Sequence, residues 1–130
     1  MKATAIDISG TFSAMPALPK MVAMVAADDA NSFALLSEFG SGGVFAASFS
    51  GHTPWERHPG DELVVVQEGA ADLILLVDDE ELRLTLAAGQ LVVVPEGTWH
   101  RFETEGVRVI GVTPQPTETS LEKRPPKDTT

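Results

Sequence analysis

The chain has 130 residues, which is enough for one domain with a single hydrophobic core and too few for two. It contains no cysteine, so disulfides, thiolate nucleophiles and thiolate metal ligands are excluded. The net charge is −10 and Lys/Arg clusters are missing, which argues against nucleic acid and anionic membranes as partners. The sequence shows neither a signal-peptide-like apolar stretch nor a run of membrane-spanning length, so we expect a soluble, cytoplasmic protein.

Residues 1–30 are expected to form an N-terminal strand or arm. Ile6 and Ile8 could begin a strand, because alternating β-branched residues favour extended structure. The apolar segment 21–27 fits either a strand or a helical turn, and its pattern does not decide between them.

The segment 31–113 carries strand signals at short, regular spacing. Leu82, Leu84 and Leu86 alternate with polar residues, and the acidic run 78–81 before them has the composition of a hairpin turn. A second turn is expected at Glu105-Gly106. The expected strands are 33–39, 44–49, 62–67, 73–77, 82–86, 91–94, 99–103 and 107–112. About eight short strands with frequent turns indicate an all-β sandwich or barrel.

Residues 114–130 differ in composition from the segment before them, because they are rich in Pro, Thr, Lys and Glu. Such a composition cannot build a core. We therefore expect a Pro-rich tail that wraps over the surface of the domain or frays.

Two segments bring together residues that can bind a metal. Glu56 and His58 are two residues apart, so on an extended segment their side chains share a face. Glu62 follows a Pro-Gly turn that reverses the chain, which lets all three side chains converge. In the second segment a strand stops at Pro95, and the chain turns on Gly97 to deliver His100 at the start of the next strand.

These two segments resemble the two motifs of the cupin superfamily. The first motif is present as Glu56, His58, Glu62 and Gly69, and the second as Gly89, Pro95, Gly97 and His100, each with the family's spacing. The resemblance implies a double-stranded β-helix, a jelly-roll barrel of two antiparallel sheets. It also implies a divalent metal ion (Mn, Fe, Zn or Ni) bound inside the barrel by Glu56, His58, Glu62 and His100.

This chain departs from the family pattern at two positions. Glu56 stands where the family has its first histidine, and Thr104 stands where the second motif ends in asparagine. A set of two carboxylates and two imidazoles is harder than the three-His set and favours Mn, Fe or Zn over soft metals. Glu56 can be a metal ligand or, if it is not bound, a general base beside the metal.

Several alternatives remain at this stage. His58 and His100 could be structural residues at turns. His52 is expected to be a rim residue, and Trp55 and Trp99 are expected to pack at the barrel mouth.

The function we favour is that of a metal-binding cupin that acts on a small organic molecule. The alternative is a non-catalytic binding or sensing module for such a molecule, and the resemblance implies a homodimer in either case. The residues expected to line the pocket indicate an apolar or weakly polar ligand; they are Val64, Val66, Leu84 and Phe102.

Overall fold

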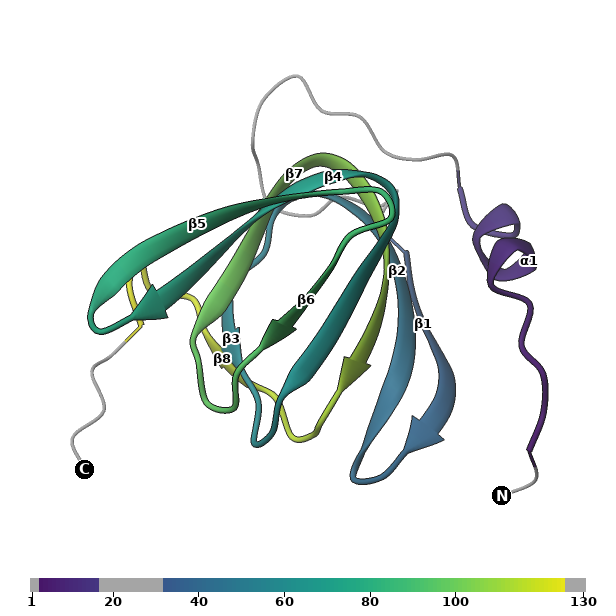
Figure 1. Cartoon of the computed structure of the whole chain (residues 1–130), viewed down its shortest axis with the longest axis horizontal. Coiled ribbons are helices and arrows are strands. Elements are labelled where there is room, and N and C mark those ends of the chain that lie inside the picture. Colours follow the sequence, from purple (N-terminus) through teal and green to yellow (C-terminus); the bar gives the residue numbers. More distant parts are fainter. Residues whose placement is uncertain (1–2, 17–31, 126–130) are drawn as a thin grey trace.

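The structure, a computed structural model, describes residues 3–16 and 32–125 of the chain. Within them it contains one short helix and eight strands (Figure 1). Their bounds are α1 Ile8–Ser13, β1 Ser32–Phe39, β2 Gly42–His52, β3 Trp55–Arg57, β4 Glu62–Val77, β5 Glu80–Ala87, β6 Leu91–Val94, β7 His100–Thr113 and β8 Glu118–Ser120. The apolar segment 21–27, for which the sequence left strand and helix open, lies outside the described residues. No helix in the described ranges is long and apolar enough to cross a membrane.

Two long antiparallel strands, β4 and β7, hold the architecture together (Figure 1). The first part of β4 pairs with β6, and its second part pairs with β5. Likewise, β7 pairs with β3 where it begins and with β2 over most of its length. Because each long strand is shared, the eight strands form one antiparallel sheet that curls around one interior. The expected all-β barrel is confirmed, and its strands belong to one continuous sheet instead of two.

Both long strands replace pairs of shorter strands that the sequence predicts. The segments 62–67 and 73–77 are one strand, β4, and the segments 99–103 and 107–112 are one strand, β7. The prediction of a turn at Glu105-Gly106 is wrong. Register shifts in β4 between Val66 and Glu68 and between Ala70 and Asp72 bend the paired strands without ending them.

Gly69 lies in the middle of this bend. Its φ is +79°, and a Cβ built on it would lie 2.2 Å from the carbonyl oxygen of Gly106 on β7. Only glycine allows both the left-handed backbone and this close approach of two strands. Gly69 is therefore required for the bend rather than for a turn between strands.

The hairpin between β4 and β5 confirms the predicted acidic turn. Asp78 and Asp79 form its two-residue loop, and both have positive φ, 51° and 69°. This geometry matches the right-handed twist of the flanking strands. Glu80, which the sequence grouped with the turn, already belongs to β5.

The main core lies inside the curled sheet, on its inner face. Leu73 and Val107 are fully buried there, next to Val66, Val94 and Phe49. Since β4 pairs with β5, β6 and β7, its inward residues contact much of this core. The period of two that the sequence shows in this region thus corresponds to inward and outward faces of strands.

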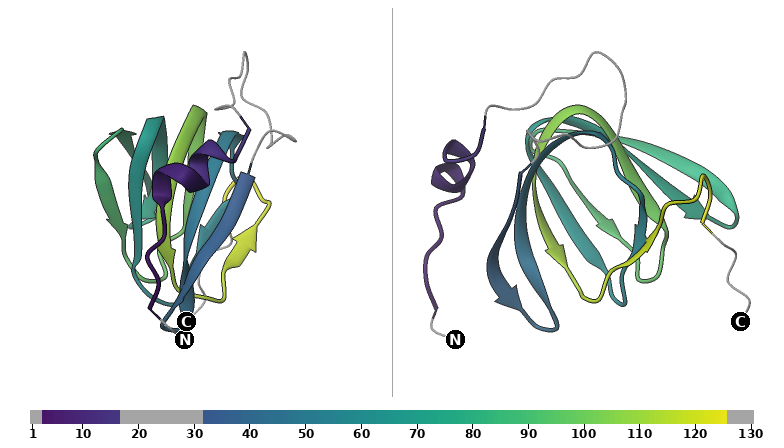
Figure 2. Two further views of the ribbon diagram at one scale, coloured as in Figure 1. Left: turned by 90° about the vertical axis from the view of Figure 1, so that its right-hand side faces the viewer. Right: turned by 180° about the vertical axis from the view of Figure 1, so that it is seen from behind.

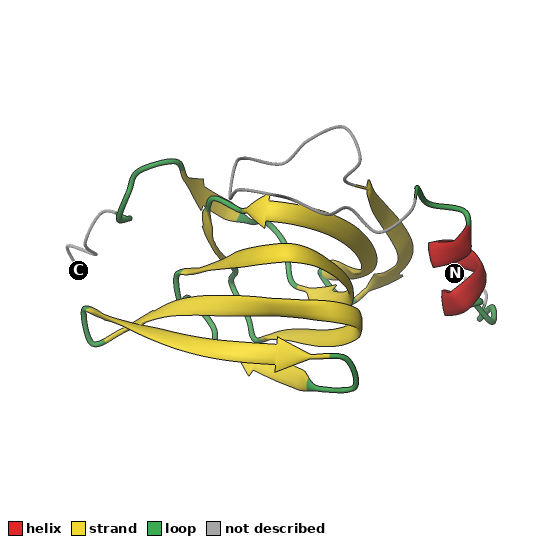
Figure 3. Ribbon diagram, turned by 90° about the horizontal axis from the view of Figure 1, so that it is seen from above, coloured by secondary structure: helices red, strands yellow, loops and turns green. Residues whose placement is uncertain are grey.

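At the N-terminus the structure has a helix where the sequence could have begun a strand. The side chain of Asp7 accepts a hydrogen bond from the backbone N–H of Gly10 at 3.1 Å, which caps α1 before Ile8. The helix lies outside the curled sheet (Figures 2 and 3) and buries Phe12 against Ala46 and Ile110. The cap and this packing outweigh the strand preference of the isoleucines.

The described part of the C-terminal segment, up to residue 125, includes a short strand. Strand β8 pairs with β3, opposite the edge that β3 shares with β7. The indole of Trp55 donates a hydrogen bond to the backbone carbonyl of Lys123 at 3.1 Å. Trp55 and Trp99 pack with Ile74 in a second apolar cluster, in agreement with the packing role expected for them.

The bend at Gly69 gives a testable prediction. We expect Gly69→Ala to lower the free energy of unfolding by more than the roughly 1–2 kcal/mol of left-handed strain, because the new methyl group collides with the Gly106 carbonyl. Gly89→Ala is the matched control, since Gly89 has φ +87° and open space where the Cβ would lie. Urea denaturation measures the free energy of unfolding of both variants. Equal losses of this free energy would contradict a special role for the close approach of β4 and β7.

Candidate metal centre

The four residues that the sequence singles out converge inside the barrel. Glu56 lies on β3, His58 follows that strand, and Glu62 and His100 are the first residues of β4 and β7. Glu56 and His100 are directly paired across β3 and β7. The side chains of His58, Glu62 and His100 are buried, and Glu56 is half-buried.

The carboxylate of Glu62 lies between the two imidazoles. Its Oε1 is 3.1 Å from Nε2 of His100, and its Oε2 is 3.4 Å from Nε2 of His58. Glu56, His58 and His100 form a cluster whose potential ligand atoms all lie within 4.8 Å of one another. Glu62 is not a member of that trio, but it contacts both of its histidines.

The outer nitrogens of both imidazoles are held by polar neighbours. Nδ1 of His100 lies 2.9 Å from the carbonyl oxygen of Thr98, which can only accept a hydrogen bond. Nδ1 of His58 lies 3.0 Å from the hydroxyl of Thr117, and that hydroxyl donates to Oε1 of Gln115 at 3.1 Å. The Thr117 oxygen therefore accepts a hydrogen from Nδ1 of His58. Each Nε2 is left facing the cluster, as in metal sites whose ligand histidines are oriented by outer partners.

His58 has a buried nitrogen with no hydrogen bond among the described residues. This atom is Nε2, and the oxygen of Glu62 beside it lies 3.4 Å away without forming a hydrogen bond. A buried polar atom without a partner is costly unless something else satisfies it. The residues present thus fit a bound cation, because potential ligand atoms of two imidazoles and the Glu56 carboxylate lie within 4.8 Å of one another.

Burial and the histidines shift the pKa values of this cluster. Burial opposes ionisation of Glu62, but its close contacts with the imidazoles of His100 and His58 outweigh burial and lower the pKa of Glu62 to about 2. Burial also disfavours the charged form of His100, yet its contact with Glu62 raises the pKa of that imidazole. The pKa of Glu56 is raised, chiefly because burial penalises the carboxylate. The two carboxylates thus differ in proton affinity, although they lie in one site.

Two loops are fixed to each other beneath the cluster. The backbone N–H of Gly97 donates to the carbonyl of His58 at 2.9 Å, and the N–H of Glu96 donates to the side chain of Asp61 at 2.8 Å. These bonds connect the first cupin-like segment to the second. Asp61, which is exposed, therefore helps to position both.

Three residues near the cluster were not predicted from the sequence. The hydroxyl of Thr113, at the end of β7, donates to Oε2 of Glu62 at 2.6 Å. Thr117 and Gln115 come from the segment assigned to the Pro-rich tail. A period-two pattern on β7 places Thr113 on the inner face, but the sequence contains no signal that brings the tail to His58.

Thr104 does not reach the cluster. Its hydroxyl donates to the carbonyl of Ala70 at 2.6 Å and accepts from the backbone N–H of Gly106 at 3.0 Å. Both partners lie at the bend of β4 and β7, where the register shift frees backbone groups. The residue at the family's asparagine position thus stabilises the bend in this chain.

A cavity of about 480 Å³ opens beside the cluster. Val64 and Phe102 line it as expected, whereas Val66 and Leu84 belong to the packed core instead. His52 is exposed and lines the cavity apart from the trio, which agrees with a rim position. The cavity is large enough for a small organic ligand.

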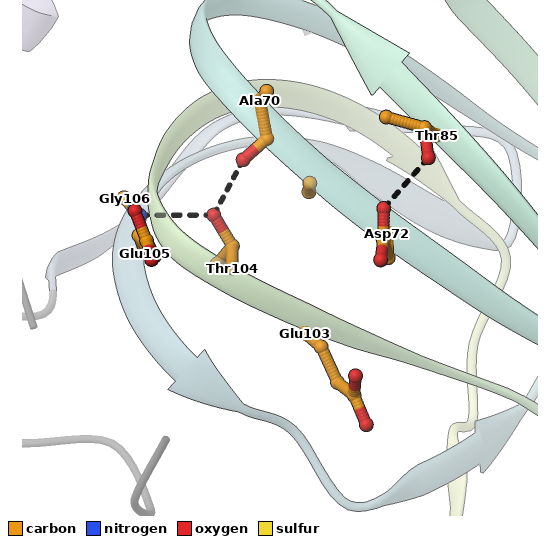
Figure 4. Close-up of a pocket in the computed structure, with 8 residues that line it drawn as sticks. Ala70, Asp72, Thr85, Glu103, Thr104, Glu105 and Gly106 are labelled. Carbon is orange, nitrogen blue, oxygen red and sulfur yellow. Dashed lines mark hydrogen bonds between the residues drawn. The ribbon is translucent and has the colours of Figure 1, made fainter. Parts of the chain in front are cut away.

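A second hollow lies at the β4–β7 bend (Figure 4). It contains the carboxylates of Asp72 and Glu103. Asp72 accepts hydrogen bonds from Thr85 and Arg83, and Glu103 is paired with Arg83 and Arg101. These carboxylates already have partners, so this hollow offers them no role as ligands.

A curled antiparallel sheet with two imidazoles inside agrees with the barrel that the sequence predicted, and sequence comparison supports it. Residues 49–112 match the family described as "Cupin domain". These residues form a cupin domain.

Individual relatives are more distant. An acireductone dioxygenase from Rhodopseudomonas palustris is 36% identical over 56 residues, which is 43% of this chain and 34% of that protein. The chain thus matches about a third of the length of this curated relative. Two solved structures share the fold at 20% identity: a cupin-2 domain containing protein from Shewanella frigidimarina (TM-score 0.57, 88% of this chain and 94% of that one) and a cupin-like protein from Thermotoga maritima (TM-score 0.59, 72% and 79%).

The low pKa of Glu62 predicts how acid destabilises the metal-free protein. Because its folded pKa of about 2 lies below the ordinary value of 4.5, Glu62 stabilises the fold above pH 4.5. That contribution, on the order of 3 kcal/mol, is lost as the pH falls from 4.5 toward 2. We expect Glu62→Gln to flatten the decline of unfolding free energy over this range.

Urea denaturation at several pH values, on chelator-treated protein, measures the effect. Glu96→Gln is the control for loss of a negative charge, since Glu96 is exposed. Parallel curves for the wild type and Glu62→Gln between pH 4.5 and 2 would contradict the assignment.

Proposed function

We propose that this cupin binds a divalent metal ion through Glu56, His58, Glu62 and His100 and acts on a small organic molecule in the adjoining cavity. The observation that carries the proposal is the unpartnered, buried Nε2 of His58, which faces Nε2 of His100 across the Glu62 carboxylate. Two imidazoles and hard carboxylate oxygens favour Mn, Fe, Zn or Ni over soft metals.

The ion would supply Lewis acidity toward an oxygen atom of the substrate. The chain's own residues would accept a proton and orient the imidazoles. Glu56, whose pKa is raised by burial, can bind the ion or take a proton beside it. Thr98 and Thr117 would hold the imidazoles in the form that presents Nε2. The dioxygenase named above supports an enzyme, while a non-catalytic binding module is the alternative.

Metal uptake tests the proposal directly. We expect His58→Ala and His100→Ala to reduce bound Mn, Fe, Zn or Ni sharply, and Glu56→Ala to reduce it less. Affinity should fall as the pH drops through the histidine range, because imidazole must be neutral to bind a metal. His52→Ala is the matched control, since His52 lies outside the cluster. Competition titrations followed by metal analysis give the affinities.

A second variant tests whether the tail orients His58. Thr117→Val keeps the shape of the side chain but removes the hydroxyl next to Nδ1, so we expect metal affinity to fall roughly tenfold. Thr117→Ser should restore it. If the wild type takes up no divalent ion under any loading condition, the metal proposal is wrong and the histidines are structural.

We also propose that the protein is a homodimer formed through the outer face of β6 and β4. Leu91 and Val93 are 59% and 51% exposed on β6, and they pair with Val65 and Leu63 on β4. This apolar face suits a second copy, because most other surfaces of a chain with net charge −10 repel each other.

A charge placed in this face tests the dimer. We expect Val93→Glu to convert a dimer into a monomer in sedimentation velocity, because the new carboxylate would be buried without a partner. Phe39→Glu is the control, since Phe39 is also exposed but lies on β1. A monomeric wild type, or a dimer that survives Val93→Glu, would refute this interface.

A further inference from the structure

The cavity beside the candidate metal centre has a wall of aromatic rings. The rings of Phe33 and Phe49 are stacked with their centroids 6.0 Å apart, and Phe49 meets Phe102 edge to face at 5.9 Å. Phe102 in turn lies edge to face with His100 at 6.5 Å. The series runs from Phe33, which is 65% exposed, to the buried imidazole of the cluster. A ligand that enters the cavity beside Phe33 therefore lies next to aromatic rings until it reaches His100.

The charge of the cavity restricts the ligand further. Among the described residues that line it, no Lys or Arg is present, and its carboxylates are Glu56 and Glu62. The arginines nearest in sequence to the cluster, Arg57 and Arg101, stack on Trp99 and Trp55 instead. The charge of a bound divalent ion is already balanced by two carboxylates. A ligand with several negative charges therefore has no cationic partner in this cavity.

From these two observations we propose that the ligand is an aromatic compound, uncharged or singly ionised, with an oxygen substituent directed at the cluster. Its ring lies along Phe33, Phe49 and Phe102. This inference deepens the proposed function and rests on it for the contact between the oxygen and a metal. The volume agrees with it: a dry cavity of roughly 150 Å³ holds benzene, so about 480 Å³ holds one substituted ring with space to spare.

Three probes of similar size test the chemical class. They are 4-methylphenol, the saturated alcohol 4-methylcyclohexanol, and the dianion benzene-1,4-dicarboxylate. Each is titrated into the full chain, both loaded with Zn²⁺ and treated with chelator, and binding is followed by calorimetry and saturation-transfer NMR. We expect 4-methylphenol to bind most tightly and the dianion least. Tighter binding of the dianion, or no binding of 4-methylphenol to either form, would overturn the inference.

Two phenylalanines on β1 form a matched pair of variants. Phe33 lines the cavity and Phe39 does not, yet the two side chains are almost equally exposed, at 65% and 63%. Because an aromatic contact is lost, Phe33→Ala should weaken binding of 4-methylphenol roughly three- to tenfold, whereas Phe39→Ala should leave it unchanged. Equal effects of the two variants would place the ligand elsewhere and refute the proposal.

A measurement that needs no variant gives a second check. Magnetisation transfer from the ring protons of bound 4-methylphenol should reach the ring protons of phenylalanine, and its absence in a bound complex would contradict the aromatic wall. Zn²⁺ uptake is measured on the same samples. Uptake without 4-methylphenol binding refutes the ligand class and leaves the metal proposal standing. Binding of 4-methylphenol without uptake refutes the metal proposal and supports the ligand class.

Discussion

The close approach of β4 and β7 at Gly69 and Gly106 is the constraint on which the rest of this structure depends. The two strands come so near that a Cβ on Gly69 would lie 2.2 Å from the Gly106 carbonyl oxygen. This contact bends both strands, so the single sheet that they share with the other strands curls around the interior. The hydroxyl of Thr104 bonds to both sides of the bend and satisfies backbone groups that the register shift leaves free.

The same two strands carry two side chains of the candidate metal centre. Glu62 is the first residue of β4 and His100 is the first residue of β7. The bend that curls the sheet therefore also sets where these side chains meet. The loops before the two strands are fixed to each other by bonds from Gly97 to His58 and from Glu96 to Asp61. Rigid strands and tied loops hold the cluster in place with little backbone freedom to lose on binding.

The electrostatics of the site extend beyond the four central residues. Glu62 remains ionised although it is buried, because two imidazoles and the Thr113 hydroxyl surround its oxygens. Thr117 and Gln115 continue the network to the C-terminal segment, which β8 attaches to β3. The segment that looks least structured in the sequence is thus in contact with a central histidine.

The sequence by itself determined the barrel class, most of the strand segments and the candidate ligands Glu56, His58, Glu62 and His100, because period-two alternation and motif spacing are local properties of the chain. It misjudged Glu105-Gly106 as a turn, since a bend between paired strands and a true turn use the same residues. Only the tertiary structure decided that Thr117 reaches His58 and that Phe33 and Phe49 line the cavity. Those contacts join residues far apart in the chain, and they exist only after β7 and β8 have packed beside β2 and β3.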